Sequence, residues 1–233
     1  MRKNKMRILL ATPTRGRPES FIEMARSARA TANKSEDLMI VGRVDRDDPK
    51  RRGYFTERGF VTWQGKRKKL PQIWNEIVEM ARFDIVMMCA DDLRFRTTRW
   101  DDEVRGVFEQ WPDRIGMVYT DDGIHGQKLA THSLVSKEFI ETVGYYLPPN
   151  LRGDFVDNWL HTLAVSIGRA AYLPRVYIEH LHPIVGKAPM DDTYGYRLAG
   201  NGPAKAQAEW DKVLASGEIE KAIERLRKAI SGS

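Results

Sequence analysis

An uninterrupted apolar stretch near the middle of the chain constrains the fold most. Within FDIVMMCADDLRF, the predicted strand 84–89 begins with Asp84, and its other residues, Ile85 to Cys89, are all apolar. Two aspartates, Asp91 and Asp92, follow after one alanine. Parallel strands that are buried on both faces have such continuous apolar sequences, whereas strands with one face in water alternate apolar and polar residues. The stretch therefore predicts a central strand of a parallel sheet that ends at an acidic pair.

Strand and helix patterns alternate along the rest of the chain. Further strands are predicted at 7–12, 38–44, 115–119 and 171–178, and helices at 21–32, 70–81, 100–111, 138–143, 155–167 and 218–230. Strands alternating with helices of this length favour an α/β fold with a mostly parallel sheet flanked by helices. A chain of 233 residues fits one domain, and the last amphipathic stretch makes a C-terminal helical extension.

The composition is that of a folded protein from a reducing compartment. Hydrophobic residues make up 42% and charged residues 30% of the chain, far from a disordered composition. The lone cysteine excludes an intrachain disulfide framework, and the first apolar run, 8–11, is too short for a signal peptide or a membrane span. We therefore expect a cytoplasmic protein. The net charge of +6 suits a polyanionic or phosphorylated ligand, and it equally suits a merely basic surface.

Polar, mostly acidic loops follow four predicted strands, with the sequences TPTRGRP, DRDDP, ADD and TDDG. Ligands of α/β sheets gather at the carboxyl ends of strands, so these loops indicate a site. Asp91 and Asp92 tolerate their mutual repulsion if a divalent cation such as Mg²⁺ or Mn²⁺ lies beside them, because these ions prefer oxygen ligands. A helix cap followed by a solvated turn is the other interpretation of this pair.

The order of these motifs resembles the GT-A glycosyltransferases of the family 2 type. ATPTRGRP after the first strand, VDRDDP after the second, KLPQIWNEI as a helix and MMCADDLRF after the central strand carry the resemblance over the first half of the chain. It implies a Rossmann-like GT-A domain at 1–200, with a nucleotide-binding half at 1–95 and an acceptor-side half at 96–200. A C-terminal helical extension at 201–233 would follow.

The resemblance also implies a donor site. Thr12, Pro13 and Arg15 would line the nucleotide, Asp45 would contact its base, and Asn75 would lie on the donor side.

A metal site is implied at the acidic pair. Asp91 and Asp92 would bind the Mn²⁺ or Mg²⁺ that bridges the donor diphosphate, and Asp91 would also contact the donor. Many relatives carry a further acid where Cys89 stands, so the number of ligands stays open. His182 in IEHLHP is the candidate third ligand, with His180 as the alternative, because a late histidine joins the acids in several GT-A enzymes. A structural hydrogen bond is the other interpretation of either histidine.

The segment LRGDFVDNWLHTLAV resembles the acceptor-side element of the same enzymes. An inverting transferase needs a carboxylate that takes the proton from the acceptor hydroxyl. Asp154 is the first candidate and Asp157 the second, and both are otherwise acids that the helix dipole favours at a helix start. The later segment GKAPMDDTYGYR is either a lid over the donor or a surface loop.

The predicted function is metal-dependent transfer of a sugar from a nucleotide diphosphate donor, preferably a UDP-sugar, to a hydroxyl acceptor. The chain is also similar to small bacteriophage-encoded glycosyltransferases, which keeps a hydroxymethylated pyrimidine in DNA open as acceptor and the host cytoplasm as location. One alternative is a sugar nucleotidyltransferase, although the Gly-rich triphosphate loop of such enzymes is absent near the first strand. The other is a non-catalytic nucleic-acid-binding protein, favoured by DPKRRG and GKRKKLP around several aromatic residues.

Overall fold

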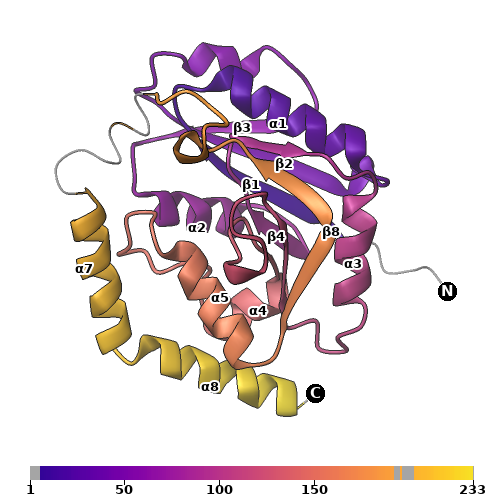
Figure 1. The fold of residues 1–233 in the computed structure, drawn as a ribbon, viewed down its shortest axis with the longest axis vertical. Helices are drawn as coiled ribbons and strands as arrows, with labels where there is room; N and C mark the ends of the chain where they lie inside the picture. The colour runs from indigo at the N-terminus through magenta and orange to yellow at the C-terminus, as the bar shows by residue number, and fades with distance from the viewer. Residues whose placement is uncertain (1–5, 192–194, 196–201, 233) are drawn as a thin grey trace.

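An eight-stranded sheet with helices on both faces makes up the part of the chain that the computed structural model describes, residues 6–191, 195 and 202–232 (Figure 1). The strand order is β3-β2-β1-β4-β7-β6-β8-β5. The strands are β1 Ile8–Thr14, β2 Leu38–Asp45, β3 Val61–Gly65, β4 Ile85–Met88, β5 Leu93–Phe95, β6 Met117–Asp121, β7 Leu134–Ser136 and β8 Ala170–His180. The predicted α/β fold is confirmed.

The first half of the sheet is parallel throughout. β1 pairs in parallel with both β2 and β4, and β2 pairs in parallel with β3. All seven residues of β1 and all four of β4 are buried, because helices cover both faces. The continuous apolar run therefore forms the central strand that its sequence predicts.

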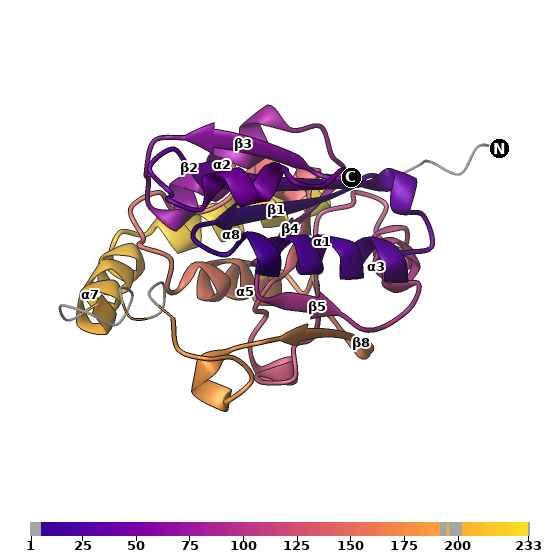
Figure 2. The ribbon, with the colours of Figure 1, turned by 90° about the horizontal axis from the view of Figure 1, so that it is seen from above.

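The second half of the sheet mixes strand directions. β7 is antiparallel to β4 and β6, β5 is antiparallel to β8, and only β6 and β8 run in parallel. Figure 2 shows how the sheet curls from β3 at one edge to β5 and β8 at the other. Four of the seven pairings are thus parallel, as a mostly parallel sheet requires.

The predicted helices all form. They are α1 Pro18–Thr31, α2 Leu70–Met80, α3 Trp100–Phe108, α4 Lys137–Val143, α5 Val156–Ser166 and α8 Glu218–Ser231. Pro18 and Pro71 stand in the first turns of α1 and α2, where a missing backbone N–H costs no hydrogen bond. Sequence patterns did not predict β3, β5, β7 or the helix α7 Gly202–Ala215.

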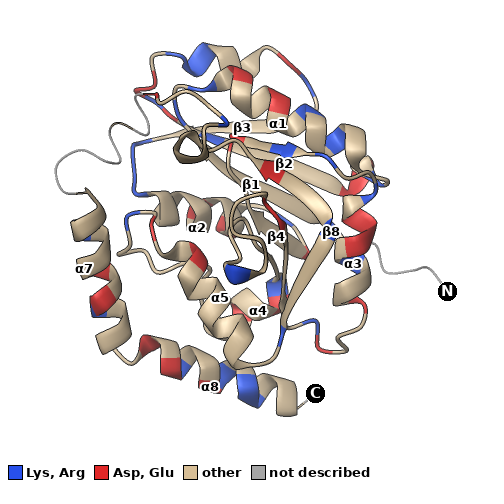
Figure 3. Ribbon diagram, viewed as in Figure 1, with Lys and Arg blue, Asp and Glu red and all other residues tan. Residues whose placement is uncertain are grey.

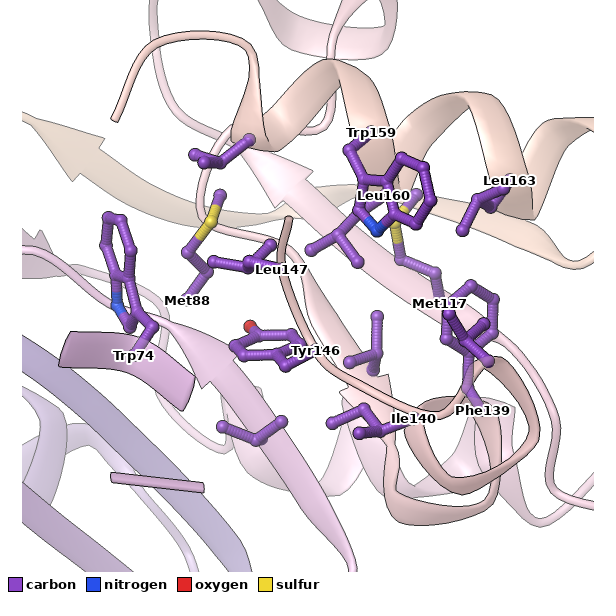
Figure 4. Packing of buried hydrophobic residues seen from close by; sticks show 14 of the residues in the cluster. Trp74, Met88, Met117, Phe139, Ile140, Tyr146, Leu147, Trp159, Leu160 and Leu163 are labelled. Atoms are coloured by element: carbon purple, nitrogen blue, oxygen red, sulfur yellow. The ribbon is translucent and has the colours of Figure 1, made fainter. Parts of the chain in front are cut away.

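Two hydrophobic cores lie on the two faces of the sheet. One joins α1 and α3 to the sheet, and the other joins α2, α4, α5, α7 and α8 to it. Figure 4 shows the second core, where Trp74, Tyr146 and Trp159 pack among aliphatic and methionine side chains. The indole N–H of Trp74 donates to the carbonyl of Ala11, 2.9 Å away, which ties α2 to β1. These cores fix the strand ends where the candidate site lies.

The C-terminal helices complete the second core. Trp210 and Val213 of α7 and Ile219 and Leu226 of α8 are buried in it. The helical extension predicted for 201–233 therefore packs as an integral part of the fold (Figure 1). The predicted boundary at 200 and 201 lies outside the described residues. Among those residues, no helix has the length and apolarity to cross a membrane.

Candidate active site

Three parallel strands deliver the predicted acids to one edge of the sheet. β1 ends at Thr14, β2 ends at Asp45, and Asp91 and Asp92 follow the end of β4. The Thr14 hydroxyl donates to Oδ2 of Asp91, 2.7 Å away, so the ends of β1 and β4 are in direct contact. Parallel strands with matching register bring these residues together although they are far apart in sequence.

Both carboxylates of the acidic pair are buried. Asp91 is 6% and Asp92 8% exposed. Burial, and then the neighbouring Asp92 carboxylate, raise the pKa of Asp91 well above its usual value. Two carboxylates in such a place need a nearby cation if both are to stay ionised.

Arg17 supplies positive charge to the pair from the start of α1. Its Nη1 lies 3.3 Å from Oδ1 of Asp91 and 3.6 Å from Oδ2 of Asp92. Its Nε and Nη2 donate to Asp191 at 2.5 and 2.6 Å. The described start of the segment predicted as a lid or surface loop thus contacts Arg17, which in turn contacts the acidic pair, whereas 192–194 and 196–201 lie outside the described residues.

His180, the last residue of β8, also contacts the pair. Its Nε2 lies 3.6 Å from Oδ1 of Asp92, and its side chain is 12% exposed. The backbone N–H of Leu181 donates to the carbonyl of Asp92 at 2.9 Å, which anchors the end of β8 against the acids. The ring of His182 lies beside that of His180, with centroids 5.0 Å apart, as two-residue spacing predicts. However, Nδ1 of His182 accepts a hydrogen bond from the N–H of Ile184 at 3.2 Å.

A third histidine packs on His180 from a loop. The centroid of the His132 ring is 4.6 Å from that of His180, and Nδ1 of His132 lies 3.3 Å from the carbonyl oxygen of Met88. Burial, and then the neighbouring His180, lower the pKa of His132 to about 4, so its ring is neutral at physiological pH.

Asp92 and His180 fit a divalent cation as a two-residue ligand set. Among the described residues, no group of three or more His, Cys, Asp or Glu side chains could hold a metal ion. A carboxylate oxygen and an imidazole nitrogen 3.6 Å apart can share one ion whose remaining ligands come from a diphosphate and water. The Ile184 contact occupies one lone pair of His182, which favours His180 over the predicted His182. Cys89 is fully buried, and burial raises the pKa of its thiol to about 12.

The donor side centres on Asp45. Arg43, whose side chain is wholly buried, donates through Nη1 to Oδ1 of Asp45 at 2.7 Å. Arg15 donates to Oδ2 of the same carboxylate at 3.2 Å and to Asp47 at 2.7 Å. Two guanidinium groups therefore hold Asp45 in a fixed orientation at the end of β2.

The other predicted donor residues lie within β1 or bind the backbone. Thr12 and Pro13 are buried within β1, because the strand is covered on both faces. The amide group of Asn75 binds the backbone of Leu147 twice, donating to its carbonyl at 2.8 Å and accepting from its N–H at 2.9 Å. Their contacts with a nucleotide stay predictions.

Asp154 and Asp157 line a cavity of about 360 Å³ at the start of α5. Its other lining residues are Gly153, Phe155, Asn158, Pro203, Ala206 and Gln207. The residue that precedes the helix is Phe155, with φ of 66°, and no side chain caps it. The cavity thus lies between the start of α5 and α7, and both candidate bases face the same space.

The wall that α7 contributes is held by specific contacts. Glu209 accepts hydrogen bonds from Lys69 and Arg152, each at 3.2 Å. The ring of Trp210 stacks on Phe155 with 4° between their planes and 5.6 Å between centroids. These contacts dock α7 on the loop that carries Asp154.

Sequence reasoning missed Thr14, Arg17 and His132. Arg17 stands inside the TPTRGRP motif, so a cation directly after the turn at a strand end was the available signal. His132 has no such signal, because it lies in an irregular loop and meets His180 only through the fold.

No protein-family model and no curated protein matches the sequence. Solved structures do match. A mannosyltransferase, PcManGT from Pyrobaculum calidifontis in complex with GDP-Man and Mn²⁺, superposes with a TM-score of 0.63 at 13% identity, over 97% of this chain and 70% of that one. TarS 1–349 of S. aureus in complex with UDP gives a TM-score of 0.60 at 11% identity, over 97% and 90%. Its complex with UDP-GlcNAc gives 0.59 at 10%, over 97% and 91%.

At these identities the likeness concerns the fold. The chain has the α/β architecture of these glycosyltransferase structures, a GT-A-like sheet flanked by helices.

Proposed function

We propose that the chain is a metal-dependent glycosyltransferase that uses a nucleotide diphosphate sugar as donor. The observation that carries the proposal is the buried pair Asp91 and Asp92, placed at the sheet edge with His180 in contact. The fold supports it, since the similar structures contain GDP-Man with Mn²⁺, UDP or UDP-GlcNAc.

The diphosphate and the base of the donor would each meet a suitable group of the protein. Asp92 and His180 would hold a Mn²⁺ or Mg²⁺ ion, which when bound neutralises charge on the diphosphate leaving group. Arg17 already contacts both acids and also offers donors to phosphate oxygens. Asp45, oriented by Arg43 and Arg15, offers a carboxylate to the N–H groups of the base. Thr12, Pro13 and Asn75 remain the proposed flanking residues of the nucleotide.

The acceptor hydroxyl would enter the cavity in front of Asp154. A carboxylate there takes the hydroxyl proton while the oxygen forms a bond to the anomeric carbon, and the bond from that carbon to the diphosphate oxygen breaks. Attack from the side opposite the diphosphate inverts the anomeric configuration. Asp157 lines the same cavity and is the second candidate for this role.

The proposal extends to the donor, the family type, the origin of the chain and the acceptor. We propose a UDP-sugar as donor, membership of the family 2 type, and bacteriophage origin with action in the host cytoplasm. A hydroxymethylated pyrimidine in DNA is the acceptor to test beside free sugars.

The nucleic-acid-binding alternative has less support. Of its aromatic residues Tyr54 is fully buried, Phe60 and Trp63 pack against the cores, and Phe55 is 49% exposed. Lys68 and Lys69 have acidic partners in Glu76 and Glu209. Figure 3 shows both signs of charge intermixed over the helices and loops. A groove in which bases stack needs several exposed aromatic rings, and of these four residues only Phe55 offers one.

Thermal melting with ligands tests the proposal most directly. UDP with Mn²⁺ should raise the melting temperature, because a ligand of the native state alone stabilises it, and EDTA should remove most of the shift. A panel of UDP- and GDP-sugars with free sugars and hydroxymethylated DNA then identifies donor and acceptor through nucleotide diphosphate release. A protein that neither binds UDP with Mn²⁺ nor releases UDP or GDP would contradict the proposal, and release of pyrophosphate from a triphosphate would favour the nucleotidyltransferase.

A further inference from the structure

A wholly buried arginine lies beside the proposed base contact. Arg43 precedes Asp45, the last residue of β2, by two positions, and none of its side chain is exposed. Residues two apart in a strand point to the same face of a sheet, so the two side chains can meet. Burying a guanidinium is costly unless it is paired and hydrogen-bonded, so its place here requires an explanation.

Three parts of the chain hold this guanidinium. Its Nη1 donates to Oδ1 of Asp45 at 2.7 Å, and its Nη2 donates to the carbonyl oxygen of Lys66. Nη2 also lies 3.6 Å from Oε2 of Glu76, a residue of α2 that pairs with Lys68 at 2.9 Å as well. The end of β2, the segment after β3 and α2 thus all fix the group that contacts Asp45.

Gly65 leaves the space that the guanidinium occupies. It lies opposite Asp45 in the neighbouring strand β3. A Cβ atom at position 65 would come within 2.7 Å of Cζ and 2.9 Å of Nε of Arg43, closer than such atoms approach one another in proteins. Any larger residue would therefore displace the guanidinium. The contact between Arg43 and Asp45 needs glycine at this position.

Both oxygens of Asp45 are oriented by arginines. Oδ1 accepts from Arg43 at 2.7 Å, and Oδ2 accepts from Arg15 at 3.2 Å. A carboxylate oxygen has two lone pairs, so each oxygen can accept a further hydrogen bond, whereas the carboxylate offers no donor. The geometry of charge-assisted hydrogen bonds is specific, so this carboxylate is held in one orientation. It therefore suits a ligand that donates an N–H group.

We propose that Arg43 is a positioning residue that sets the base preference of the donor site. By holding Asp45 as a fixed acceptor, it selects nucleobases whose ring carries an N–H group, as uracil and guanine do. Cytosine and adenine carry an unprotonated ring nitrogen at the equivalent edge, and its lone pair would face the carboxylate and be repelled. The inference rests on the proposed function, in which Asp45 contacts the base.

Substitution of Gly65 tests this role without changing either charged residue. Gly65→Ala should displace the guanidinium, because the end of a long side chain moves more readily than the backbone. Calorimetry with Mn²⁺ measures the dissociation constants of UDP, GDP, CDP and ADP. The wild type should bind UDP or GDP about 10- to 100-fold more tightly than CDP and ADP, and this ratio should fall about tenfold in the variant. Gly106→Ala in α3, where an added Cβ meets open space, is the matched control.

A second substitution changes the acceptor itself. Asp45→Asn replaces one carboxylate oxygen by an amide that donates, so it should abolish the preference for UDP or GDP. Circular dichroism checks that each variant is folded. This variant also decides the inference if Gly65→Ala does not fold, because a preference that survives in Asp45→Asn would mean that another group selects the base.

The outcomes separate this inference from the proposed function. A reduced ratio in Gly65→Ala with an unchanged ratio in the control supports the inference. A wild-type ratio in folded Gly65→Ala, or equal weakening of all four nucleotides, overturns it, because a merely structural role would affect the four alike. Equal affinity of the wild type for all four overturns it too, although nucleotide binding would stand. Failure of the wild type to bind any of them would contradict the proposed function, and the inference with it.

Discussion

The two places that carry the proposed site residues, the acidic pair and the cavity at the start of α5, are built differently. At the metal end, Asp91 and Asp92 are almost fully buried and contact Thr14, Arg17 and His180. At the base end, Asp154 and Asp157 line a cavity of about 360 Å³, one wall of which comes from α7. The metal end is held by strand ends within the sheet, whereas the base end is formed by a helix start and a second helix packed on it.

This difference indicates a division of labour. Groups fixed by several strands are already oriented for the donor, which favours preorganised binding of charge. The shape of the cavity at the start of α5 depends on where α7 docks, through Glu209 and Trp210. On the proposed function, donor binding would depend on the sheet and acceptor selectivity on the C-terminal helices.

The largest effect should come from the metal end. Asp92→Ala removes the carboxylate of the ligand pair, so kcat/KM should fall by about 10³-fold or more, because a bound cation stabilises the transition state by several kcal/mol. Asp91→Ala should be equally impaired, and EDTA should inactivate the wild type. Nucleotide release measures activity, and circular dichroism checks the fold. Glu220→Ala, at an exposed acid of α8 far from these residues in sequence, is the control. Full activity in either variant or in EDTA would refute the metal site.

Substitution of the candidate base should give the next largest effect, and it should change kcat without changing the affinity for UDP. Asp154→Asn should lower kcat by about 10²- to 10⁴-fold, because the acceptor proton loses its base. The dissociation constant for UDP, measured by calorimetry, should not change. Asp157→Asn should have a smaller effect, and the reverse order would assign the base to Asp157.

Asp122 should matter for the stability of the metal end. Burial would raise the pKa of its carboxyl, but hydrogen bonds from Thr131 and the N–H groups of Ile124 and His125 hold the pKa well below its usual value. A depressed pKa stabilises the folded protein above the unfolded pKa, and this contribution is lost as the pH falls. Asp122→Asn should therefore lower the free energy of unfolding by about 2 kcal/mol at pH 7.

Urea denaturation at two pH values tests the sign of this effect. The deficit of Asp122→Asn should be smaller near pH 3 than at pH 7, because the wild-type carboxylate has lost part of its advantage there. A deficit that is the same at both values would mean that the charge of Asp122 contributes nothing.

The smallest effect should come from the contact that docks α7. Glu209→Gln weakens the pairs with Lys69 and Arg152, whose side chains are 40% and 50% exposed. Exposed pairs contribute at most about 1 kcal/mol, so KM for the acceptor should rise about fivefold at most, while KM for the donor stays constant. Glu224→Gln, at an exposed glutamate of α8, is the matched control. An equal change in both KM values would contradict the division between the two ends.

Long periodic segments made most of the fold predictable. The apolar run that became β4 and the helical spacing of α1 and α8 carry their structure in local sequence. β5 and β7 have three residues each, too few for a period, and their pairing is decided by the strands beside them. α7 buries only Ala206, Trp210 and Val213 and so has a weak apolar stripe.

The part of the candidate site that could be predicted consists of residues that are adjacent in the sequence. Asp91 and Asp92 stand together in the sequence, so their proximity needs no fold. Arg17 and His132 contact residues far away in the sequence: 74 positions separate Arg17 from Asp91, and 48 separate His132 from His180. Only the paired strand ends bring them into contact. Such contacts are harder to predict than the acidic pair, because they depend on tertiary packing.

The single thiol of the chain offers a built-in reporter. Cys89 lies between the last residue of β4 and the acidic pair, with its sulfur sealed in the core. A thiol reagent can attack it only when this part of the sheet opens, because burial both shields the sulfur and, by raising the pKa of the thiol, keeps it protonated in the closed structure. The labelling rate therefore measures how often the end of β4 opens, and on the proposed function a bound nucleotide should lower that rate.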